Sequence, residues 1–464
     1  MAFDHAIVLG GSITGLLAAA AAAGEFERVT VVDRDELIVD GPDAENSRRG
    51  VPQGDQVHHL LALGAERIED LLPGFDKDLL AAGGERHDNL AGFAAWMRSS
   101  WRVRFESDLA LTCFTRPLFE SVIRKRVLAL PNVTALKSVV SGLIATEDNG
   151  TIIGARVKNA PDGQLLGDLV IDATGRGTKT PNWIQDLGYA RPEESHLRVY
   201  MGYTCYRVEI PEGIFTDGVV SVASPSAADA KSTRSIVVWP CGRGQHIVVA
   251  FGALREYPPT DLAGIQELAD SLDVPLLGEA IRSAKVLSEP KHYQMPGDQR
   301  ILWEELDRRP EGFVVLGDAV ASYNPAYGQG MTMAAVGSVE LRAILRQASG
   351  DIVGVADAFQ KGLAPHVDMA WNNALGIDST YPGAEYENLT PPQPAPPEFS
   401  AAFVGLQSED PEVALGARLA MHWMDNSYIT TDSIQSKIAA WIEEGRQPKP
   451  ESTDPTVIPR LVRA

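Results

Sequence analysis

A glycine-rich turn near the start of the chain has the spacing of a dinucleotide-binding loop. The turn reads Gly10, Gly11, Ser12, Ile13, Thr14, Gly15, between the apolar stretch "HAIVLG" and the helix-forming stretch "TGLLAAAAAA". In the GxGxxG pattern the first glycine allows the tight turn, the second lets the backbone approach a pyrophosphate, and the third lets helix and strand pack closely. Gly10 and Gly15 hold the first and third places, and Ser12 replaces the second glycine with a small hydroxyl residue. We therefore expect phosphates to bind at this helix start.

An acidic residue ends the next apolar stretch, as such a site requires. Asp33 closes "RVTVVD" 18 residues after Gly15 and is followed by Arg34. A carboxylate here accepts hydrogen bonds from ribose hydroxyls and repels a 2′-phosphate. The predicted ligand is an adenosine nucleotide without that phosphate, as in FAD or NAD, and both residues are assigned to the predicted site.

A second motif separates FAD from NAD. The stretch "GFVVLGDAVASYNPAYGQGM" places Asp318 after an apolar run, then a loop with Pro325, and then Gly328, Gly330 and Met331 at the start of a helix. It resembles the GD motif of the class A flavoprotein monooxygenases, which have the para-hydroxybenzoate hydroxylase fold. The resemblance implies that Asp318 binds the ribityl chain of FAD. It also implies that the helix start at 328–331 stabilises negative charge on the flavin.

Two further segments resemble the same family, and the resemblance extends over about residues 3–375. "DLVIDATGRG" is similar to its DG region, with Asp172 in the acidic position. "TRPLFESVIRKR" is similar to its arginine-bearing helix, which implies that Arg116 contacts the cofactor. Together these motifs predict FAD as the cofactor.

The segment "GVPQGDQVHHLLALGAERIEDLLPG" resembles a bacterial polyketide-tailoring subgroup that includes the olefin epoxidases of polyether pathways. Those enzymes tend to have an Arg-His pair where this chain has Asp55 and Gln56. An acid there would repel both an anionic reduced flavin and the phosphates of NAD(P)H. If this loop faces solvent, the replacement is neutral.

The same subgroup contains the dialkyldecalin synthases of spirotetronate and spirotetramate pathways, which this chain also resembles. That resemblance implies an antibiotic-biosynthesis enzyme of the isomerase type, with FAD in a structural role. It would catalyse an intramolecular [4+2] (Diels-Alder) cyclisation of an apolar linear polyene by holding diene over dienophile. Such a reaction needs no acid or base, so no catalytic residue and no metal ligand is singled out. The alternative is an FAD- and NAD(P)H-dependent monooxygenase or epoxidase of polyketide olefins, and a non-catalytic flavin-binding scaffold is a third hypothesis.

The elements that would position these residues follow from the apolar patterns. Strand, turn, helix and strand within residues 5–35 predict a βαβ unit, and 197–255 has the alternation of antiparallel strands. The fold class is therefore α/β, a Rossmann-like FAD-binding domain with an inserted antiparallel β-sheet substrate domain and C-terminal helices. The expected ranges are 1–190 and 296–389 for the FAD-binding domain, 191–295 for the β-rich domain and 390–464 for a proline-rich connector and helices. Four residues of the β-rich segment could line a substrate cavity or belong to ordinary core: Tyr200, Tyr203, Tyr206 and Trp239.

Composition restricts the partners and the compartment. The 464 residues carry 62 acidic against 41 basic side chains, a formal charge of −21, which disfavours nucleic acid and anionic membrane. Three cysteines without CxxC spacing indicate neither disulfides nor zinc, and a reducing cytoplasm is expected. The apolar run 6–24 has no basic residue before it and is broken by glycines, so neither an export signal nor a membrane span is expected. Residues 390–398 are expected to be extended, and the chain after about Gln447 to be a loose tail.

Overall fold

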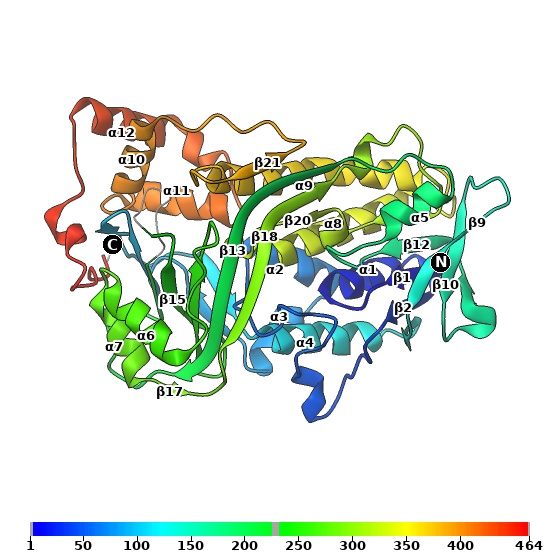
Figure 1. Ribbon diagram of the computed structural model, residues 1–464, viewed down its shortest axis with the longest axis horizontal. Helices are drawn as coiled ribbons and strands as arrows, with labels where there is room; N and C mark the ends of the chain where they lie inside the picture. Colours follow the sequence, from blue (N-terminus) through cyan, green and yellow to red (C-terminus); the bar gives the residue numbers. More distant parts are fainter. Residues whose placement is uncertain (1–2, 225–231, 463–464) are drawn as a thin grey trace.

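Two regions of the protein are joined by a long pair of strands. The computed structural model describes residues 3–224 and 232–462. Strands β13 (Glu194–Glu209) and β18 (Lys291–Ile301) run side by side from one region to the other (Figure 1). Because these strands share hydrogen bonds along most of their length, the two regions are held by a continuous ladder.

The first region is built on a five-stranded parallel sheet in the order β19-β12-β1-β2-β8. Its strands are β1 (Phe3–Leu9), β2 (Phe26–Asp33), β8 (Val133–Lys137), β12 (Leu169–Asp172) and β19 (Phe313–Val315). Parallel strands are covered on both faces, which explains why these segments are apolar almost throughout. The predicted βαβ unit is confirmed, and all its carboxyl ends meet at one edge of the sheet.

Helices cover one face of this sheet, and a small second sheet lies against β12. Helix α1 (Ile13–Ala23) is rich in alanine and buried almost throughout, so that α4 (Arg116–Leu128) and α8 (Gln329–Ala348) pack closely against it. Helix α9 (Val355–Asp378) packs on α8. The small sheet is antiparallel and contains β9 (Val140–Ala145), β10 (Ile152–Val157) and β11 (Gln164–Leu166). Further helices of this region are α2 (Ala62–Leu71), α3 (Phe75–Ala81) and α5 (Thr180–Asp186).

The second region is a ten-stranded sheet whose main path is β20-β18-β13-β16-β15-β14-β5-β6. Its shorter strands are β5 (Phe93–Met97), β6 (Ser100–Trp101), β14 (Ser221–Ser224), β15 (Ser235–Pro240), β16 (His246–Gly252), β17 (Lys285–Val286), β20 (Ala321–Ser322) and β21 (Glu385–Glu387). The pairing is antiparallel as expected, except that β14 and β5 are parallel. Strands from outside 191–295 complete this sheet. Local patterns could not indicate β5 and β21, because their partners β14 and β13 are more than a hundred residues away.

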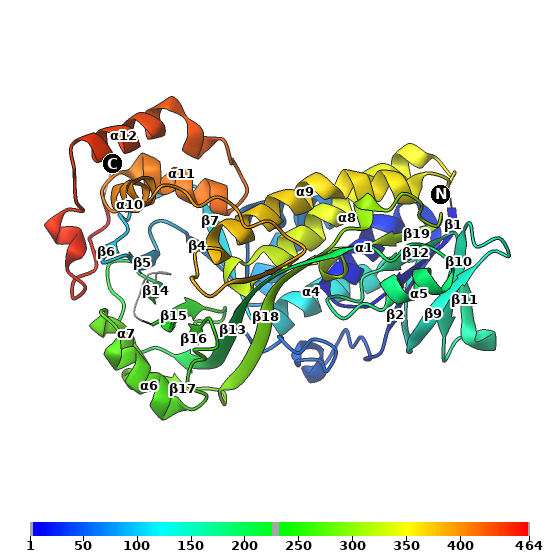
Figure 2. The ribbon, with the colours of Figure 1, turned by 45° about the horizontal axis from the view of Figure 1, so that its top comes forward.

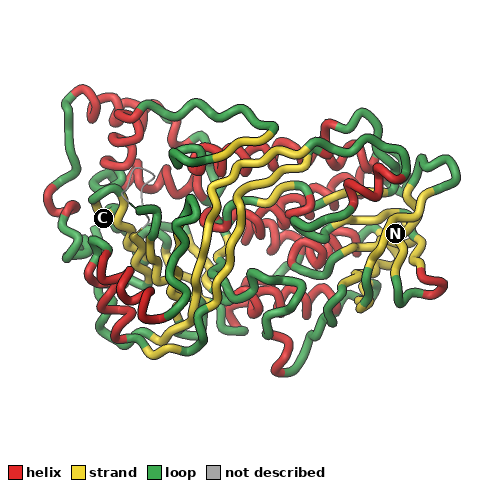
Figure 3. Tube along the Cα trace, viewed as in Figure 1, coloured by secondary structure: helices red, strands yellow, loops and turns green. Residues whose placement is uncertain are grey.

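Alternation along these strands gives the sheet two apolar faces. One face packs on α6 (Leu262–Ser271) and α7 (Pro275–Ser283), and the other faces the first region. Between the regions lies a three-stranded sheet of β3 (His59–Leu60), β7 (Ala110–Cys113) and β4 (Glu85–Asp88). Figure 3 shows the long pair of strands crossing the molecule, with helices between this pair and the strands near the N-terminus.

The C-terminal helices pack on one another beside the ten-stranded sheet (Figure 2). They are α10 (Pro397–Leu406), α11 (Pro411–Met421) and α12 (Asp432–Glu443). Residues 391–396 belong to neither a helix nor a strand, whereas Pro397 and Glu398, which were expected in the extended connector, form the first turn of α10. Proline is accepted there because the first helical residues need no internal N–H bond. No helix in the described part of the chain is both long and apolar enough to cross a lipid bilayer.

The expectation of a loose tail after Gln447 was wrong. The Trp101 indole N–H donates to the carbonyl of Asp454 at 2.8 Å, and Arg104 donates to the carbonyl of Pro459 at 3.0 Å. The Val462 N–H donates to the Arg104 carbonyl at 2.8 Å. These bonds use backbone groups of the tail, which its polar and proline-rich composition does not reveal.

Candidate functional site: a cofactor cradle between two turns

The first turn has the geometry for which its glycines are needed. Gly10 has a φ of +100°, and a Cβ on it would lie 2.4 Å from the carbonyl oxygen of Ala173. A Cβ on Gly15 would lie 1.8 Å from the Gly10 oxygen. Helix α1 begins after Ser12, whose side chain does not cap it, so the first N–H groups of the helix remain available to a phosphate.

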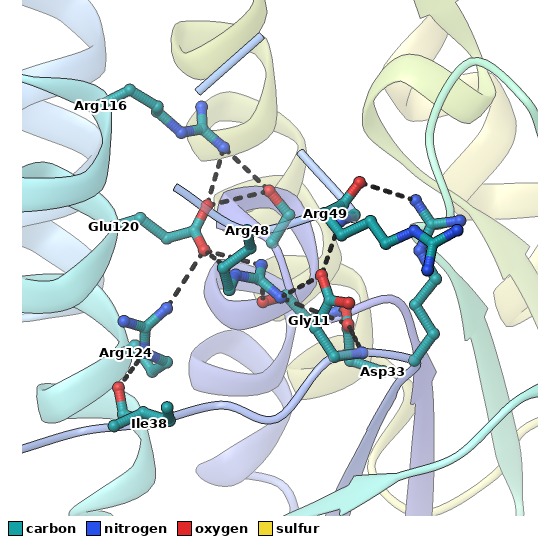
Figure 4. A network of polar contacts seen from close by, with 12 residues as sticks. Gly11, Asp33, Ile38, Arg48, Arg49, Arg116, Glu120 and Arg124 are labelled. Carbon is teal, nitrogen blue, oxygen red and sulfur yellow. Dashed lines mark hydrogen bonds and ion pairs between the residues drawn. The ribbon is translucent and has the colours of Figure 1, made fainter. Parts of the chain in front are cut away.

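The Ser12 hydroxyl instead belongs to a network of charged residues (Figure 4). It donates to Oε2 of Glu120 at 3.2 Å and accepts from Nη2 of Arg116 at 2.8 Å. Arg116 also donates to Glu120 at 3.0 Å, while its buried Nε has no partner among the described residues. Arg116, which the sequence assigns to the cofactor, therefore lies directly at the turn.

Asp33 also lies at the turn, as expected of a ribose-binding acid. Its carboxylate accepts the Gly11 N–H at 2.6 Å and a bond from Arg48 at 3.3 Å (Figure 4). Arg34 points elsewhere and donates to the carbonyl of Arg49 at 3.3 Å. Of the two residues predicted to bind the nucleotide here, the structure places Asp33 at the turn and directs Arg34 into the neighbouring loop.

Arg48 is a site residue that the sequence analysis missed. It donates to the Gly11 carbonyl at 3.0 Å and to Glu120 at 2.8 Å, in addition to Asp33. Burial by itself raises the pKa of Glu120, but the charges of Arg116, Arg48 and Arg124 outweigh it and lower that pKa. Glu120 is thus an ionised carboxylate that holds arginines around the phosphate position. The sequence feature that could have indicated this role is the pair of adjacent arginines, Arg48 and Arg49, just before "GVPQ".

The second turn meets the first. A Cβ on Gly317 would lie 2.5 Å from Cγ2 of Thr14, so residues 303 positions apart touch. Asp318 accepts no hydrogen bond from the described residues; burial raises the pKa of its carboxyl, while Arg116 and Arg176 lower it. Arg176, which also donates to Ser322 Oγ at 3.0 Å, is a second cation that sequence reasoning did not identify.

The start of α8 is open on the side that the sequence assigns to the flavin. Gly328 has a φ of +64° and caps the helix without a side-chain bond. A Cβ on Gly330 would have only one neighbour within 4 Å, Oδ1 of Asp318 at 3.8 Å. Pro325 and Gly330 are exposed, whereas Met331 and Ile13 are buried core residues that position their turns. Free N–H groups, room beside Gly330 and an unbonded carboxylate form a cradle that a ligand would complete.

Asp172 has a structural role in the loop after β12. Its fully buried carboxylate accepts bonds from Thr174, Thr178 and Thr180 at 2.6–2.9 Å. With both oxygens in use, it stabilises the loop after β12 instead of facing the cradle.

In the loop after "GVPQ", the side chain of Asp55 faces solvent and that of His59 faces the cofactor cradle. Asp55 is exposed and accepts from the Ser47 hydroxyl at 2.5 Å, and Gln56 donates to the Lys291 carbonyl at 3.1 Å. His59 lies against the cradle, since a Cβ on Gly328 would be 2.4 Å from its Nε2. The solvent-facing alternative for Asp55 is the one the structure shows.

Both histidines of this loop are uncharged. Burial, followed by the charge of Arg116, lowers the pKa of His58 to about 3. Burial, followed by the charge of Arg418, lowers the pKa of His59 to about 4. These imidazoles therefore add polar groups and no charge to the space beside α8.

The four cavity candidates of the β-rich segment separate by face. Tyr203 and Trp239 lie on the face toward the first region, where Tyr203 donates to Asn324 Oδ1 at 2.7 Å and Trp239 packs 5.0 Å from His59. Tyr206 lies on the opposite face in the core with α6 and α7. Tyr200 lies where β13 has an irregularity between Arg198 and Met201, and the guanidinium of Arg255 is 3.3 Å from the centre of its ring. Strand alternation puts Tyr203 and Tyr206 on opposite faces because they are an odd number of residues apart.

A buried pair of carboxyl groups supports the loop before α8. Asp298 accepts the Asn324 N–H at 2.6 Å, and Asp378 accepts both bonds of the Asn324 amide at 3.0 Å and one from Tyr327. Burial, followed by the charge of Asp378, raises the pKa of Asp298 well above its usual range, and burial raises the pKa of Asp378. The pair therefore retains a proton that the unfolded chain releases.

We expect Asp298→Asn to stabilise the protein in alkaline solution. A carboxyl whose pKa is raised by folding stabilises least when the pH is high, because the unfolded state then gains by ionising it. The free energy of unfolding of the wild type should thus fall as pH rises above about 4, the ordinary value for aspartate, and through the raised pKa. Asparagine keeps the acceptor for Asn324 and offers Asp378 a permanent donor, so the loss should shrink by about 1 kcal/mol or more. Thermal melts over a pH series measure this, with exposed Asp307→Asn as the control; parallel pH profiles of wild type and Asp298→Asn would contradict it.

Comparison with solved structures defines the class of fold. The structure of the flavin-dependent brominase Bmp2 superimposes with a TM-score of 0.66, 14% identity and coverage of 95% of this chain and 99% of that one. PqsL of Pseudomonas aeruginosa, described as a probable FAD-dependent monooxygenase, gives a TM-score of 0.60 at 16% identity over 82% and 99%. The fold is the α/β fold of class A flavoproteins expected from the sequence, and FAD is the cofactor that this fold carries.

Sequence comparison places the chain in a family. It is 30% identical over 470 residues to Protein Rv3254 of Mycobacterium tuberculosis, covering 96% of both chains, and it belongs to the same family. It is also 25% identical over 357 residues to squalene monooxygenase SE2 of Panax ginseng, covering 74% of this chain and 58% of that one. A scan against protein-family models finds no match.

Proposed function

We propose that the protein is an FAD-dependent oxygenase acting on an apolar, olefin-bearing small molecule of the polyketide type. The observation that carries this choice over a redox-silent role is the position of Asp55. Its carboxylate faces solvent and Ser47, so it does not oppose negative charge at the flavin. The cations that do lie close are Arg116 and Arg176, both of which lower the pKa of Asp318.

The cradle residues suit the parts of FAD. The N–H groups after Ser12, with Arg48 and Arg116 beside them, suit the pyrophosphate. Asp33 suits the adenosine ribose, and Asp318 suits the ribityl hydroxyls because its carboxylate has no donor among the residues that the structure describes. Arg48 now occupies a bond to Asp33 that a ribose hydroxyl could share.

The substrate would lie between the open start of α8 and the inner face of the ten-stranded sheet. Half-buried apolar side chains pack against the apolar cluster of this face, among them Val57, Val237, Trp239 and Phe251. His58 and His59 are uncharged beside them. Such a surface holds an apolar chain and excludes water from its reacting part.

FAD supplies electron transfer from NAD(P)H and activation of oxygen when it is bound. Epoxidation of an olefin in this way consumes one O2, one NAD(P)H and one proton, and yields the epoxide, water and NAD(P)+. The residues of this chain contribute position and charge: the α8 N-terminus and Arg176 stabilise negative charge, and the sheet orients the olefin.

An intramolecular [4+2] cyclisation of a linear polyene is the second candidate. The apolar inner face and the neutral imidazoles favour it, because a cycloaddition needs a shaped surface and no proton transfer. In that case FAD would serve the stability of the fold.

One experiment separates the two. The FAD-loaded protein is mixed anaerobically with NADPH, and the colour of the flavin is followed in a stopped-flow instrument. If the protein is an oxygenase, NADPH should reduce the flavin and its yellow colour should fade. Under labelled O2 the protein should then convert a linear polyene to a product that contains one labelled oxygen. A flavin that stays oxidised, together with a cyclised product of unchanged mass formed without O2, would establish the cyclase instead.

A further inference from the structure

Arg418 is a partly buried cation without an anionic partner in the described part of the chain. Among the described residues, the one hydrogen bond of its side chain runs from Nη1 to the thioether of Met421 at 2.8 Å, and its buried Nε has no partner there. Burial alone lowers the pKa of this guanidinium to about 10, and no carboxylate opposes the effect. The side chain nevertheless remains charged at neutral pH.

The more deeply buried arginines have partners at a terminal nitrogen, although Nε of Arg102, Arg116 and Arg300 has none among the described residues. Arg104 pairs with Asp217, Arg116 and Arg124 pair with Glu120, and Arg102 donates to the carbonyls of Asn89 and Phe93. Withdrawing a charge from water without a counter-ion is costly to folding even where the burial is partial, so it is tolerated where a ligand supplies the missing partner.

The position of Arg418 connects it with the cofactor cradle. It lies one helical turn before His422, whose ring accepts the Ala62 N–H at 3.2 Å and whose carbonyl accepts the Leu63 N–H at 3.4 Å. The end of α11 is thus attached to the start of α2, immediately after His59. The charge of Arg418 lowers the pKa of His59 and of His422. His59 in turn lies against Gly328 at the start of α8.

The surroundings of Arg418 lack a compensating acid. Arg102 adds a second positive charge, and His59 and His422 are uncharged, because burial lowers the pKa of His422 to about 3. Asp88 is the acid that acts on Arg102, but it accepts bonds from the backbone of Leu90 and Ala91 and from Ser107. The Trp239 ring lies beside His59 and packs 4.8 Å from Phe93. An anionic head on an apolar body fits this arrangement of one free guanidinium and flat rings.

We propose that Arg418 binds a carboxylate or enolate carried by the substrate and so sets which end of the apolar molecule lies away from α8. The proposal rests on the proposed function, since it assigns the substrate to the same site. It makes α11 a part of the active site and predicts that neutral analogues are poor ligands.

The test measures binding to the FAD-loaded protein, without turnover. Decadienoate and its methyl ester are titrated by calorimetry into wild type, Arg418→Met and Arg418→Lys, with Arg346→Met at an exposed ion pair of α8 as the control. Wild type and the control should bind the acid at least about tenfold more tightly than the ester. Arg418→Met should lose that preference, Arg418→Lys should keep part of it, and Arg418→Met should melt no lower than wild type because an unpaired charge is gone.

Equal affinity of the wild type for acid and ester, or an unchanged preference in Arg418→Met, would overturn the proposal. A failure of the proposed oxygenase would be seen separately, because flavin reduction by NADPH is measured in the absence of either ligand.

Discussion

Asp318→Asn should purify with little FAD and should bind added FAD about 10- to 100-fold more weakly than the wild type. The carboxylate has no hydrogen-bond donor within the described protein, and hydrogen bonds to a charged group contribute about 1.5–3 kcal/mol each. Asparagine has the same shape but no charge, so the change isolates the electrostatic part of ribityl binding. Titration of apoprotein with FAD, followed by quenching of flavin fluorescence, measures the affinity.

The stability of the apoprotein distinguishes this role from a structural one. Burial raises the pKa of Asp318, so an ionised carboxylate there lowers the free energy of unfolding of the apoprotein at neutral pH. Apo Asp318→Asn should therefore melt at the same or a higher temperature than the apo wild type, although it has lost its cofactor. Exposed Asp307→Asn should change neither quantity. Full flavin content in Asp318→Asn would show that the ribityl chain binds elsewhere.

Gly15→Ala should destabilise the protein by about 3 kcal/mol or more. The added Cβ would lie 1.8 Å from the carbonyl oxygen of Gly10, and the nearest neighbour is backbone that cannot rotate away. Relief would require α1 to move from β1, which would also displace the N–H groups assigned to the pyrophosphate. Urea unfolding of the apoprotein and FAD titration should both report the change.

Gly24→Ala is the matched control at the other end of the same helix. Gly24 has a right-handed φ of −74°, and a Cβ there would meet nothing within 4 Å. Alanine at such a position stabilises by about 0.4–1 kcal/mol through the unfolded state. If the two variants had equal stability, the close approach of strand and helix at Gly15 would not be a constraint.

The βαβ unit and the two turns could be predicted because their determinants are local. Gly15 answers a steric demand from Gly10 in the same turn, Gly10 itself takes a φ of +100°, and Asp33 ends a strand recognisable from its own composition. The split of the first region around a β-rich insertion followed from the change in alternation. The contact of Thr14 with Gly317 was implied only by the resemblance, since nothing in either segment specifies the other.

The residues that were missed act over long distances. Arg48 lies in an irregular loop, and its role appears only when that loop folds back on Gly11 and Glu120. Arg176 and Arg418 look like solvated side chains in the sequence, because burial is decided by elements far along the chain. The direction in which the Asp55 side chain points cannot be read from any local pattern. Because this side chain is exposed, the expected repulsion between Asp55 and a reduced flavin is not supported.

The anchored tail has a consequence for synthesis on the ribosome. Trp101 and Arg104 take their partners from residues 353 and 355 positions later. At about 5–20 residues per second, translation of that interval lasts roughly 20–70 s. Over that time the edge strand that includes Trp101 has emerged from the exit tunnel without the segment that covers it. Nascent chains halted before position 454 should therefore recruit holdase chaperones that released full-length chains no longer engage.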